Sequence, residues 1–344
     1  MAKEETKRTE ISSLGEFGLI ERLTKDFKTG APVAKGVGDD AAVIIRGDEA
    51  TVITTDLLIE GIHFDLMYMP LKHLGYKAVT VNLSDIAAMN AVPGQVLISI
   101  AISNRFSVEA MEELYSGVKA ACELYGVSLI GGDTSSSVSG LFISVTAIGT
   151  AAKDDVVYRS GAKVGDIICV TGDLGGAYAA LQLLEREKAV YLENSQIQPE
   201  LKGRDYIIAR QLKPEARTDV IRIFKEKKIK PTAMIDVSDG LSSDIMHICK
   251  QSGTGALIRE SDLPIHPETY SMALEFRIDP TMCALNGGED YELLFTASPQ
   301  DAEKLKSDPD VTIIGEVLEK KEGIKLVSKG GSTHALVAQG WKAF

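Results

Sequence analysis

The stretch IDVSDGLSSD (residues 235–244) joins an apolar, strand-like run to a helix-like segment through a turn of small residues that carries aspartates. An acid at such a turn is common as a helix N-cap, which is the ordinary interpretation of any single case. The same pattern recurs along the chain, and the repetition favours a shared chemical purpose. The other runs of this kind are GVGDDAAV (36–43), TTD (54–56), NLSDIAAM (82–89), GGDTSSS (131–137) and NGGEDYELLF (286–295).

The positions of these acids favour a ligand site over simple capping. Asp85 and Asp239 each follow a serine at the start of a helix-like segment, while Asp40 and Asp133 lie on glycine turns, where backbone can approach a ligand closely. Two carboxylates about 4 Å apart repel by about 4 kcal/mol at an effective dielectric of about 20, so a converging set needs cations. Carboxylates without His or Cys partners select hard ions such as Mg²⁺, the usual companion of nucleotide phosphates. ATP chemistry is therefore the leading hypothesis.

Sequence signatures of the common nucleotide-binding folds are absent. The chain has no G-x-x-x-x-G-K-[ST] and no H-R-D loop, and Gly36-Val37-Gly38 lacks the third glycine of the dinucleotide fingerprint. A chain that uses ATP without them has a fold outside those groups. A hydrolase is disfavoured, because G-x-S-x-G is missing and the five histidines show no ligand spacing.

Length, charge and cysteine use restrict the class of protein further. The 344 residues suffice for about two domains, and a net charge of −12 disfavours a nucleic-acid partner. No apolar run reaches the roughly 18 residues that span a bilayer, and residues 1–14 lack the apolar segment of a secretory signal. We therefore expect no membrane association and a cytoplasmic location. The four cysteines lie dozens of residues apart, which predicts free thiols.

Alternating strand-like and helix-like segments predict a mixed α/β chain. A polar, glycine-bearing segment at 153–163 interrupts the pattern, so we expect domains at 1–152 and 153–344. Ser107 is expected to cap a helix, 189–204 to be a loop, and no motif assigns 262–282. The predicted strands are 43–45, 51–55, 95–103, 127–130, 141–151, 166–171, 233–236, 255–258, 291–297, 311–314 and 324–327, and the predicted helices are 17–26, 71–89, 108–124, 177–187 and 205–211.

Together these motifs resemble those of the thiamine-monophosphate kinases, a family of the aminoimidazole-ribonucleotide-synthetase-like superfamily. The resemblance runs from about Gly15 to the C-terminus, and it is most specific at GIHF (61–64), RSGAKVGD (159–166), GGEDYELLF (287–295) and the terminal Trp-Lys. It implies an α+β N-terminal domain whose small sheet pairs with that of a second subunit, a C-terminal α/β domain, and an ATP site between them. It also implies a homodimer that transfers the γ-phosphoryl group of ATP to thiamine monophosphate with several Mg²⁺ ions.

The resemblance further implies roles for single residues. Positions matching Mg²⁺ ligands are Asp40, Thr54, Thr55, Asp56, Asp85, Asp133, Asp236 and Asp239. Positions matching ATP contacts are Tyr115, Gly132, Asp133, Arg159 and Ser238, and those matching substrate contacts are His63, Glu289 and Trp341. The residues implied in catalysis are Asp85, Asp133, Arg159 and Asp239. One departure is Asn90, where the family usually has Gly; Asn tolerates a left-handed backbone better than most residues.

Each site residue also has a plainer interpretation. Arg159 could form an interdomain ion pair, His63 could be a core histidine, and Trp341 could pack the C-terminus. Glu289 and Asp290 could be a solvated strand entry. A metal-bound phosphate acceptor needs no general base, because a phosphate oxygen is already ionised near neutral pH, so direct in-line transfer is expected.

Other functions within the superfamily remain as alternatives. Selenophosphate synthesis is disfavoured because no cysteine precedes Cys122, and hydrogenase maturation because the chain ends in Phe344 and not in Cys. Aminoimidazole ribonucleotide synthesis is a further member of the set. A non-catalytic, nucleotide-sensing protein is the alternative from another class, and its sign would be the loss of metal ligands.

Overall fold

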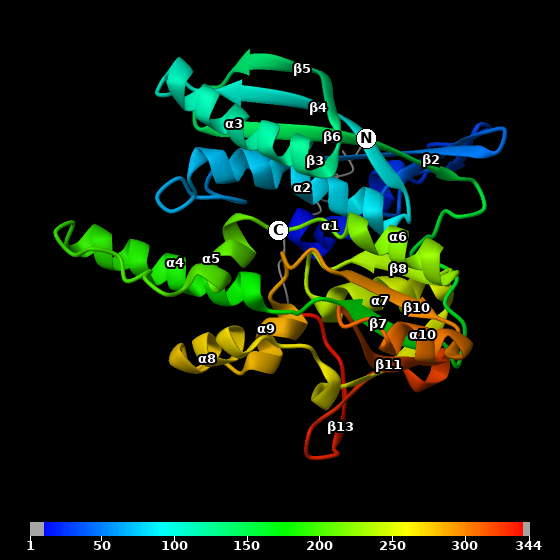
Figure 1. The fold of residues 1–344 in the computed structure, drawn as a ribbon. Helices are drawn as coiled ribbons and strands as arrows, with labels where there is room; N and C mark the ends of the chain where they lie inside the picture. The colour runs from blue at the N-terminus through cyan, green and yellow to red at the C-terminus, as the bar shows by residue number, and fades with distance from the viewer. Residues whose placement is uncertain (1–9, 340–344) are drawn as a thin grey trace, which may run out of the picture.

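A computed structural model describes residues 10–339, which form two units that stack with helix α2 between them (Figure 1). Each unit is built on one sheet with helices packed against it, so the predicted mixed α/β fold is confirmed. None of the helices within 10–339 is long and apolar enough to cross a membrane. Trp341 lies outside the described residues.

The first sheet has the strand order β1-β2-β3-β6-β4-β5, in which neighbours are antiparallel except for the parallel pair β4 and β5. Helices α2 (Leu71–Ala88) and α3 (Val108–Tyr125) cover one of its faces. The strands are β1 (Val33–Lys35), β2 (Ala42–Arg46), β3 (Glu49–Ile59), β4 (Val92–Ile102), β5 (Ser128–Ser136) and β6 (Leu141–Ala152).

Two glycines set how closely α2 and α3 cross. A Cβ on Gly75 would lie 1.9 Å from the backbone oxygen of Leu114, and one on Gly117 would lie 1.8 Å from that of Lys72. No side chain fits at such distances, so the two helix backbones touch. This contact fixes α2 against the sheet, and α2 in turn carries Ser84 and Asp85 to the junction of the two units.

Within residues 10–339, no helix covers the opposite face of the first sheet, and no strand pairs with the outer edge of β5. Side chains along β4 and β6 alternate between the buried face and this open face, where polar residues such as Ser99 and Ser144 lie. Edge strand β5 is exposed along all nine residues. This is the part of the molecule where a second subunit is predicted.

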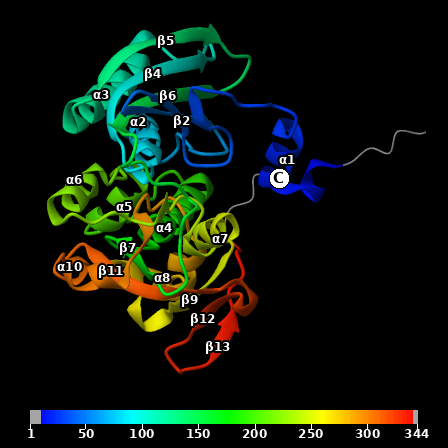
Figure 2. The ribbon, with the colours of Figure 1, turned by 90° about the vertical axis from the view of Figure 1, so that its right-hand side faces the viewer.

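The second sheet has the order β13-β12-β9-β11-β7-β10-β8 and is mainly antiparallel. Figure 2 shows α1 (Gly15–Thr24) beside α7, where the ring centroids of Phe17 and His247 are 4.2 Å apart. The strands are β7 (Ile167–Thr171), β8 (Ala233–Asp236), β9 (Thr254–Arg259), β10 (Leu293–Ala297), β11 (Val311–Glu319), β12 (Ile324–Val327) and β13 (Thr333–Ala335). The helices are α4 (Gly176–Glu193), α5 (Asp205–Leu212), α6 (Thr218–Lys227), α7 (Leu241–Ser252), α8 (Pro267–Glu275), α9 (Pro280–Asn286) and α10 (Ala302–Lys306), with 3₁₀ turns at Ile11–Ser13, Glu260–Asp262, Pro299–Asp301 and Lys320–Glu322.

Two local predictions are confirmed by backbone geometry. Ser107 caps α3, because its Oγ accepts a hydrogen bond from the Ala110 amide at 3.3 Å. Asn90 adopts the left-handed conformation with φ 55°, and its Nδ2 donates to the Asp155 carbonyl at 2.8 Å. The turn after α2 therefore survives without a glycine. All four cysteines are free; Cys122 is half-buried and the others are buried.

Other local predictions are wrong. The expectation that Asp85 begins a helix fails, because α2 starts at Leu71 and Asp85 lies in its last turn. The predicted loop at 189–204 is partly helical, since α4 continues to Glu193. Tyr191 and Leu192, in its last turn, are apolar but exposed, so their spacing did not indicate a buried helix face. Helix α6 was not expected at all, and α8 and α9 fill the unassigned stretch at 262–282.

Candidate active site

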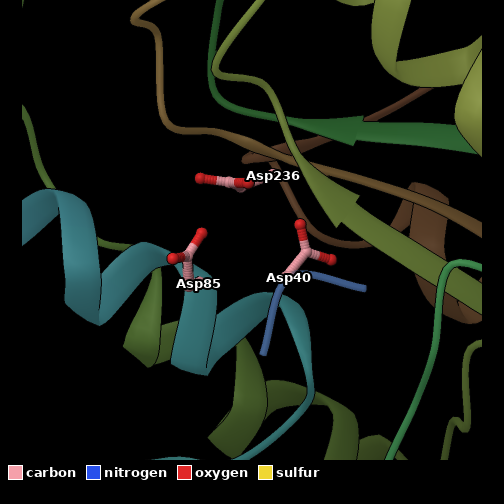
Figure 3. A group of neighbouring side chains, drawn as sticks. All are labelled: Asp40, Asp85 and Asp236. Carbon is pink, nitrogen blue, oxygen red and sulfur yellow. The ribbon is translucent and has the colours of Figure 1, made fainter. Parts of the chain in front are cut away.

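Three aspartates from distant parts of the chain converge between the two units, as Figure 3 shows. Asp40 lies just before β2, Asp85 in the last turn of α2, and Asp236 at the end of β8. Each offers one carboxylate oxygen, and these oxygens all lie within 4.8 Å of one another. Asp40 is 7% exposed and Asp236 is 2% exposed. We call these three residues the aspartate trio.

Hydroxyl groups hold two members of the trio in place. Ser84 Oγ donates to Asp236 Oδ2 at 2.6 Å, which joins α2 to β8 across the junction. Thr54 Oγ1, on β3, donates to Asp85 Oδ2 at 2.6 Å. Thr54 and Ser84 are both buried, so solvent does not compete for these hydrogen bonds. The carboxylates are therefore fixed before any ligand arrives.

Arg159 forms an ion pair, as its plainer interpretation predicts, and the partner is Asp40, a member of the trio. Its Nε and Nη2 donate to Asp40 Oδ1 at 3.1 and 2.6 Å, and its backbone N–H donates to Asp39 Oδ1 at 3.0 Å. Asp40 Oδ2 is buried and has no hydrogen-bond partner among residues 10–339. A buried polar atom without a partner costs about 1–3 kcal/mol, so this oxygen is suited to a ligand.

Crowding in a buried place makes these carboxylates hold their protons. Burial raises the pKa of Asp40 to about 7, although Arg159 acts in the opposite direction. Burial raises the pKa of Asp236 to about 6, and burial followed by the charges of Asp56 and Asp236 raises that of Asp85 well above its usual range. A cation would reverse these shifts. An all-oxygen donor set fits Mg²⁺, and the trio could hold it.

Two further predicted metal residues lie beside the trio. Asp56 is in β3, on the same side of the strand as Thr54, and its backbone N–H donates to Asn82 Oδ1 at 3.0 Å. Asp239 lies between β8 and α7, and burial raises its pKa to about 6, as it does for Asp56. Thr55 points to the opposite face of the sheet, where its hydroxyl donates to the Val145 carbonyl at 3.1 Å.

Within one chain, Asp133 and Gly132 lie far from the trio. Asp56 pairs with Val145, Val145 with Ile98, and Ile98 with Gly132, so Gly132 is three strands away from Asp56, or about 14 Å. Asp133 lies opposite Ser99, whose exposed side chain points away from the helices.

The predicted substrate and remaining nucleotide residues occupy several places. Glu289 adjoins Ser238, because its backbone N–H donates to the Ser238 carbonyl at 2.8 Å. His63 is exposed after β3 and its Nδ1 accepts from the Ile59 amide at 3.0 Å, so the core-histidine interpretation is wrong. Tyr115 is partly buried on α3, and no contact among residues 10–339 joins it to the trio.

Sequence reasoning missed two groups of buried residues near these contacts. Asp244 on α7 is 1% exposed, and no described residue makes a hydrogen bond to its Oδ2. Burial, and then the charge of Asp239, raises the pKa of Asp244 well above the ordinary range. Asp290 and Glu292 are also buried, so the solvated strand entry is wrong for this segment. Asp290 Oδ2 accepts from the Gly175 amide at 2.7 Å at the start of α4. In the sequence, Asp244, Asp290 and Glu292 are acids within the apolar motifs IDVSDGLSSD and NGGEDYELLF, and that position was the signal that could have found them.

Comparison with known proteins decides the family. The models of AIR synthase related protein match its N-terminal domain to residues 38–151 and its C-terminal domain to residues 163–327. Thiamine-monophosphate kinase of Bacillus subtilis is 35% identical over 337 residues, which cover 96% of this chain and 100% of the relative. The chain belongs to the thiamine-monophosphate kinase family. The family relative from Aquifex aeolicus is 36% identical over 97% of this chain and 99% of its own length.

A solved structure of the same family shares the whole fold. AaThiL complexed with AMPPCP and TMP has a TM-score of 0.83 to this chain at 34% identity, covering 98% of this chain and 100% of that one. The family and fold inferred from the motifs are therefore confirmed, and so is the class of enzyme. The roles of single residues are not part of these comparisons and stay predictions.

Proposed function

We propose that this chain phosphorylates thiamine monophosphate with ATP, giving thiamine diphosphate and ADP. The observation that carries the proposal is the aspartate trio at the junction of the two units, in a chain that is 35% identical over its full length to a thiamine-monophosphate kinase. The solved relative that binds AMPPCP and TMP supports both substrates. A non-catalytic nucleotide sensor is less well supported, because the carboxylates expected of an enzyme are present.

Mg²⁺ would be held by the trio together with Asp56 and Asp239. Bound there, it supplies positive charge for the phosphate groups that react. Thr54 and Ser84 fix the carboxylates, and the unpartnered Asp40 Oδ2 leaves a donor atom for the ion.

The chain's own residues orient the two phosphate groups. Arg159 lies beside Asp40 and can stabilise negative charge that develops on the transferred group. Ser238, a predicted ATP contact, accepts a hydrogen bond from the backbone of Glu289, a predicted substrate contact, at 2.8 Å. ATP at Ser238 and thiamine monophosphate at Glu289 would therefore bind next to each other, as direct transfer requires.

A second copy of the chain would complete the site. Asp133 and Gly132 lie about 14 Å from Asp56 on an exposed edge strand, and a sheet edge left open in this way invites pairing with another chain. We infer a homodimer in which these two residues serve the trio of the partner. We also propose that the chain is divided into domains at 1–152 and 153–344. We further propose a cytoplasmic location.

Incubation of the purified protein with ATP, Mg²⁺ and thiamine monophosphate tests the function. Chromatography should show thiamine diphosphate and ADP in equal amounts. Thiamine itself should give none, since it lacks the phosphate acceptor. Free phosphate with unchanged thiamine monophosphate would point to another reaction of the superfamily, and ATP binding without ADP would point to a sensor.

A further inference from the structure

A buried lysine lies at the junction of the two units. Lys77 on α2 is 1% exposed, and its Nζ lies 3.0 Å from Glu289 Oε1. The same Nζ donates to the backbone oxygen of Gln211 at 3.2 Å. Burying an ammonium group costs several kcal/mol unless it is paired. The contacts with Glu289 and Gln211 offset this cost for Lys77.

Glu289 is held at both carboxylate oxygens by different donors. Lys77 contacts Oε1, and Gln211 Nε2 donates to Oε2 at 2.7 Å. The Glu289 side chain is nevertheless 32% exposed, so one edge of the carboxylate stays open. A side chain fixed at two points and open at a third is arranged to receive a ligand in one orientation.

The backbone around Glu289 is strained in a way that needs such support. Gly288, Glu289 and Tyr291 have φ of 70°, 57° and 54°, which is the left-handed region. For a residue other than glycine this conformation costs about 1–2 kcal/mol, and it persists only where the surroundings hold it. The amide of Tyr291 donates to the Val237 carbonyl at 2.9 Å, beside Asp236.

Helix α2 connects this contact to the aspartate trio. Lys77 and Ser84 are seven residues apart, which is about two turns, so they lie on the same helix face about 10 Å apart along the axis. Lys77 reaches Glu289 from that face, and Ser84 reaches Asp236. One rigid helix therefore sets the spacing between the trio and the Glu289 carboxylate.

We propose that Lys77 is a positioning residue that fixes the Glu289 carboxylate for the phosphate-bearing acceptor substrate. The inference rests on the proposed function, in which Glu289 contacts that substrate. Lys77 does not touch the substrate itself in this account. Its charge holds one oxygen of Glu289, and the open edge of the carboxylate then meets the substrate without a search through side-chain rotamers.

A double-mutant cycle tests whether Lys77 acts through Glu289. Lys77→Met removes the charge at similar length, and it should raise KM for thiamine monophosphate by about tenfold while KM for ATP changes by less than about twofold. Lys77→Arg keeps the charge and should restore much of the loss. In a Glu289→Gln background, Lys77→Met should add less than about twofold, because the carboxylate it positions is already gone.

Three results would overturn the proposal. An unchanged KM in Lys77→Met is one, and an equal rise in both backgrounds is another, since Lys77 would then contact substrate or serve the fold alone. If Lys77→Met does not fold, Gln211→Met removes the other anchor of Glu289 and leaves the ion pair. That variant should raise the same KM by a smaller factor, and no rise would be the third contrary result.

Titration calorimetry with thiamine monophosphate and Mg²⁺, without ATP, separates this proposal from the proposed function. If wild type binds the compound and Lys77→Met binds it equally tightly, the positioning role is wrong and the kinase assignment stands. If wild type does not bind it and forms no thiamine diphosphate, the kinase assignment is wrong and Lys77 loses its role with it.

Discussion

Arg159 donates two hydrogen bonds to one oxygen of Asp40 and leaves the other oxygen buried, with no partner in the part of the chain that the structure describes. The guanidinium thus offsets part of the charge of Asp40 and does not cover the whole carboxylate. One oxygen of Asp40 belongs to the group of carboxylate oxygens that lie within 4.8 Å of one another. The interdomain ion pair and the proposed metal site are therefore compatible uses of the same aspartate.

Asp85→Asn should abolish most of the activity without weakening the fold. The change removes a metal ligand and also removes one of several mutually repelling carboxylates, so turnover should fall by about 100-fold or more while the metal-free Tm stays equal or rises. Asp48→Asn is the matched control, because Asp48 is an exposed acid paired only with Lys153 on the surface. An active Asp85→Asn variant would remove this residue from the site.

The stability gained from Mg²⁺ should increase with pH. Burial raises the pKa of Asp40 from its ordinary value of 3.8 to about 7, and it raises the pKa of Asp236 to about 6. The folded state binds these protons more tightly than the unfolded state does. The folding stability that the bound protons supply is therefore complete below about pH 4 and is lost as the pH rises toward 7. Mg²⁺ replaces the protons, so its Tm shift should be larger at about pH 8 than at about pH 5.5. A shift independent of pH in thermal scans with Mg²⁺ or EDTA would contradict the linkage.

Transfer should be direct. The acceptor is an ionised phosphate oxygen that needs no activation, and the group of possible metal ligands found among residues 10–339 consists of aspartates. ATP made chiral at the γ-phosphorus should therefore give product of inverted configuration. Retention, read by ³¹P NMR, would indicate two successive transfers through a phosphoenzyme.

Mixing two inactive variants tests whether Asp133 serves the partner's site. Asp85→Asn and Asp133→Asn should each be inactive alone, and equal mixing after reversible dissociation should restore about a quarter of wild-type activity. Half of the dimers are then mixed, and one of their two sites contains both intact aspartates. A mixture that stays inactive would place both residues in the same subunit's site. Sedimentation giving only a 37.0 kDa species would rule out the dimer itself.

Trp341→Ala tests the one predicted substrate contact that lies outside the described residues. An aromatic face attracts a cation such as a thiazolium by about 0.5–2 kcal/mol, so KM for thiamine monophosphate should rise several-fold to tens-fold. The KM for ATP and the Tm should change little. A lower Tm with an unaltered KM would make Trp341 a packing residue.

Local signals in the sequence predicted local structure well. The apolar period of α3 and its Ser107 cap located that helix to within one residue, and the alternation in β6 located that strand. Helix α6 was missed although Val220 and Phe224 have the spacing of one helix face, because its 10 residues are fewer than the window of about 11–18 in which a helical period is counted. Short helices that begin at a proline, such as α9, offer too few residues for a period to be read.

The convergence of the site was beyond any local signal. Asp40, Asp85 and Asp236 come from a loop, a helix end and a strand end, and only the packing of two domains brings them together. The motifs named them as a set because the family resemblance supplied that knowledge. Lys77 lies within the predicted helix 71–89, yet its partner Glu289 lies in the other domain, so its burial could not be inferred.

The glycine contact between α2 and α3 lies away from the candidate active site, yet it sets the position of the α2 residues that belong to that site. Even a methyl group at Gly75 or Gly117 would meet a backbone oxygen at less than 2 Å, so the helices would have to separate. Ser84 and Lys77 would then move as one body relative to Asp236 and Glu289. An inherited or engineered change at either glycine would thus resemble an active-site lesion in its kinetics, although neither position faces a substrate.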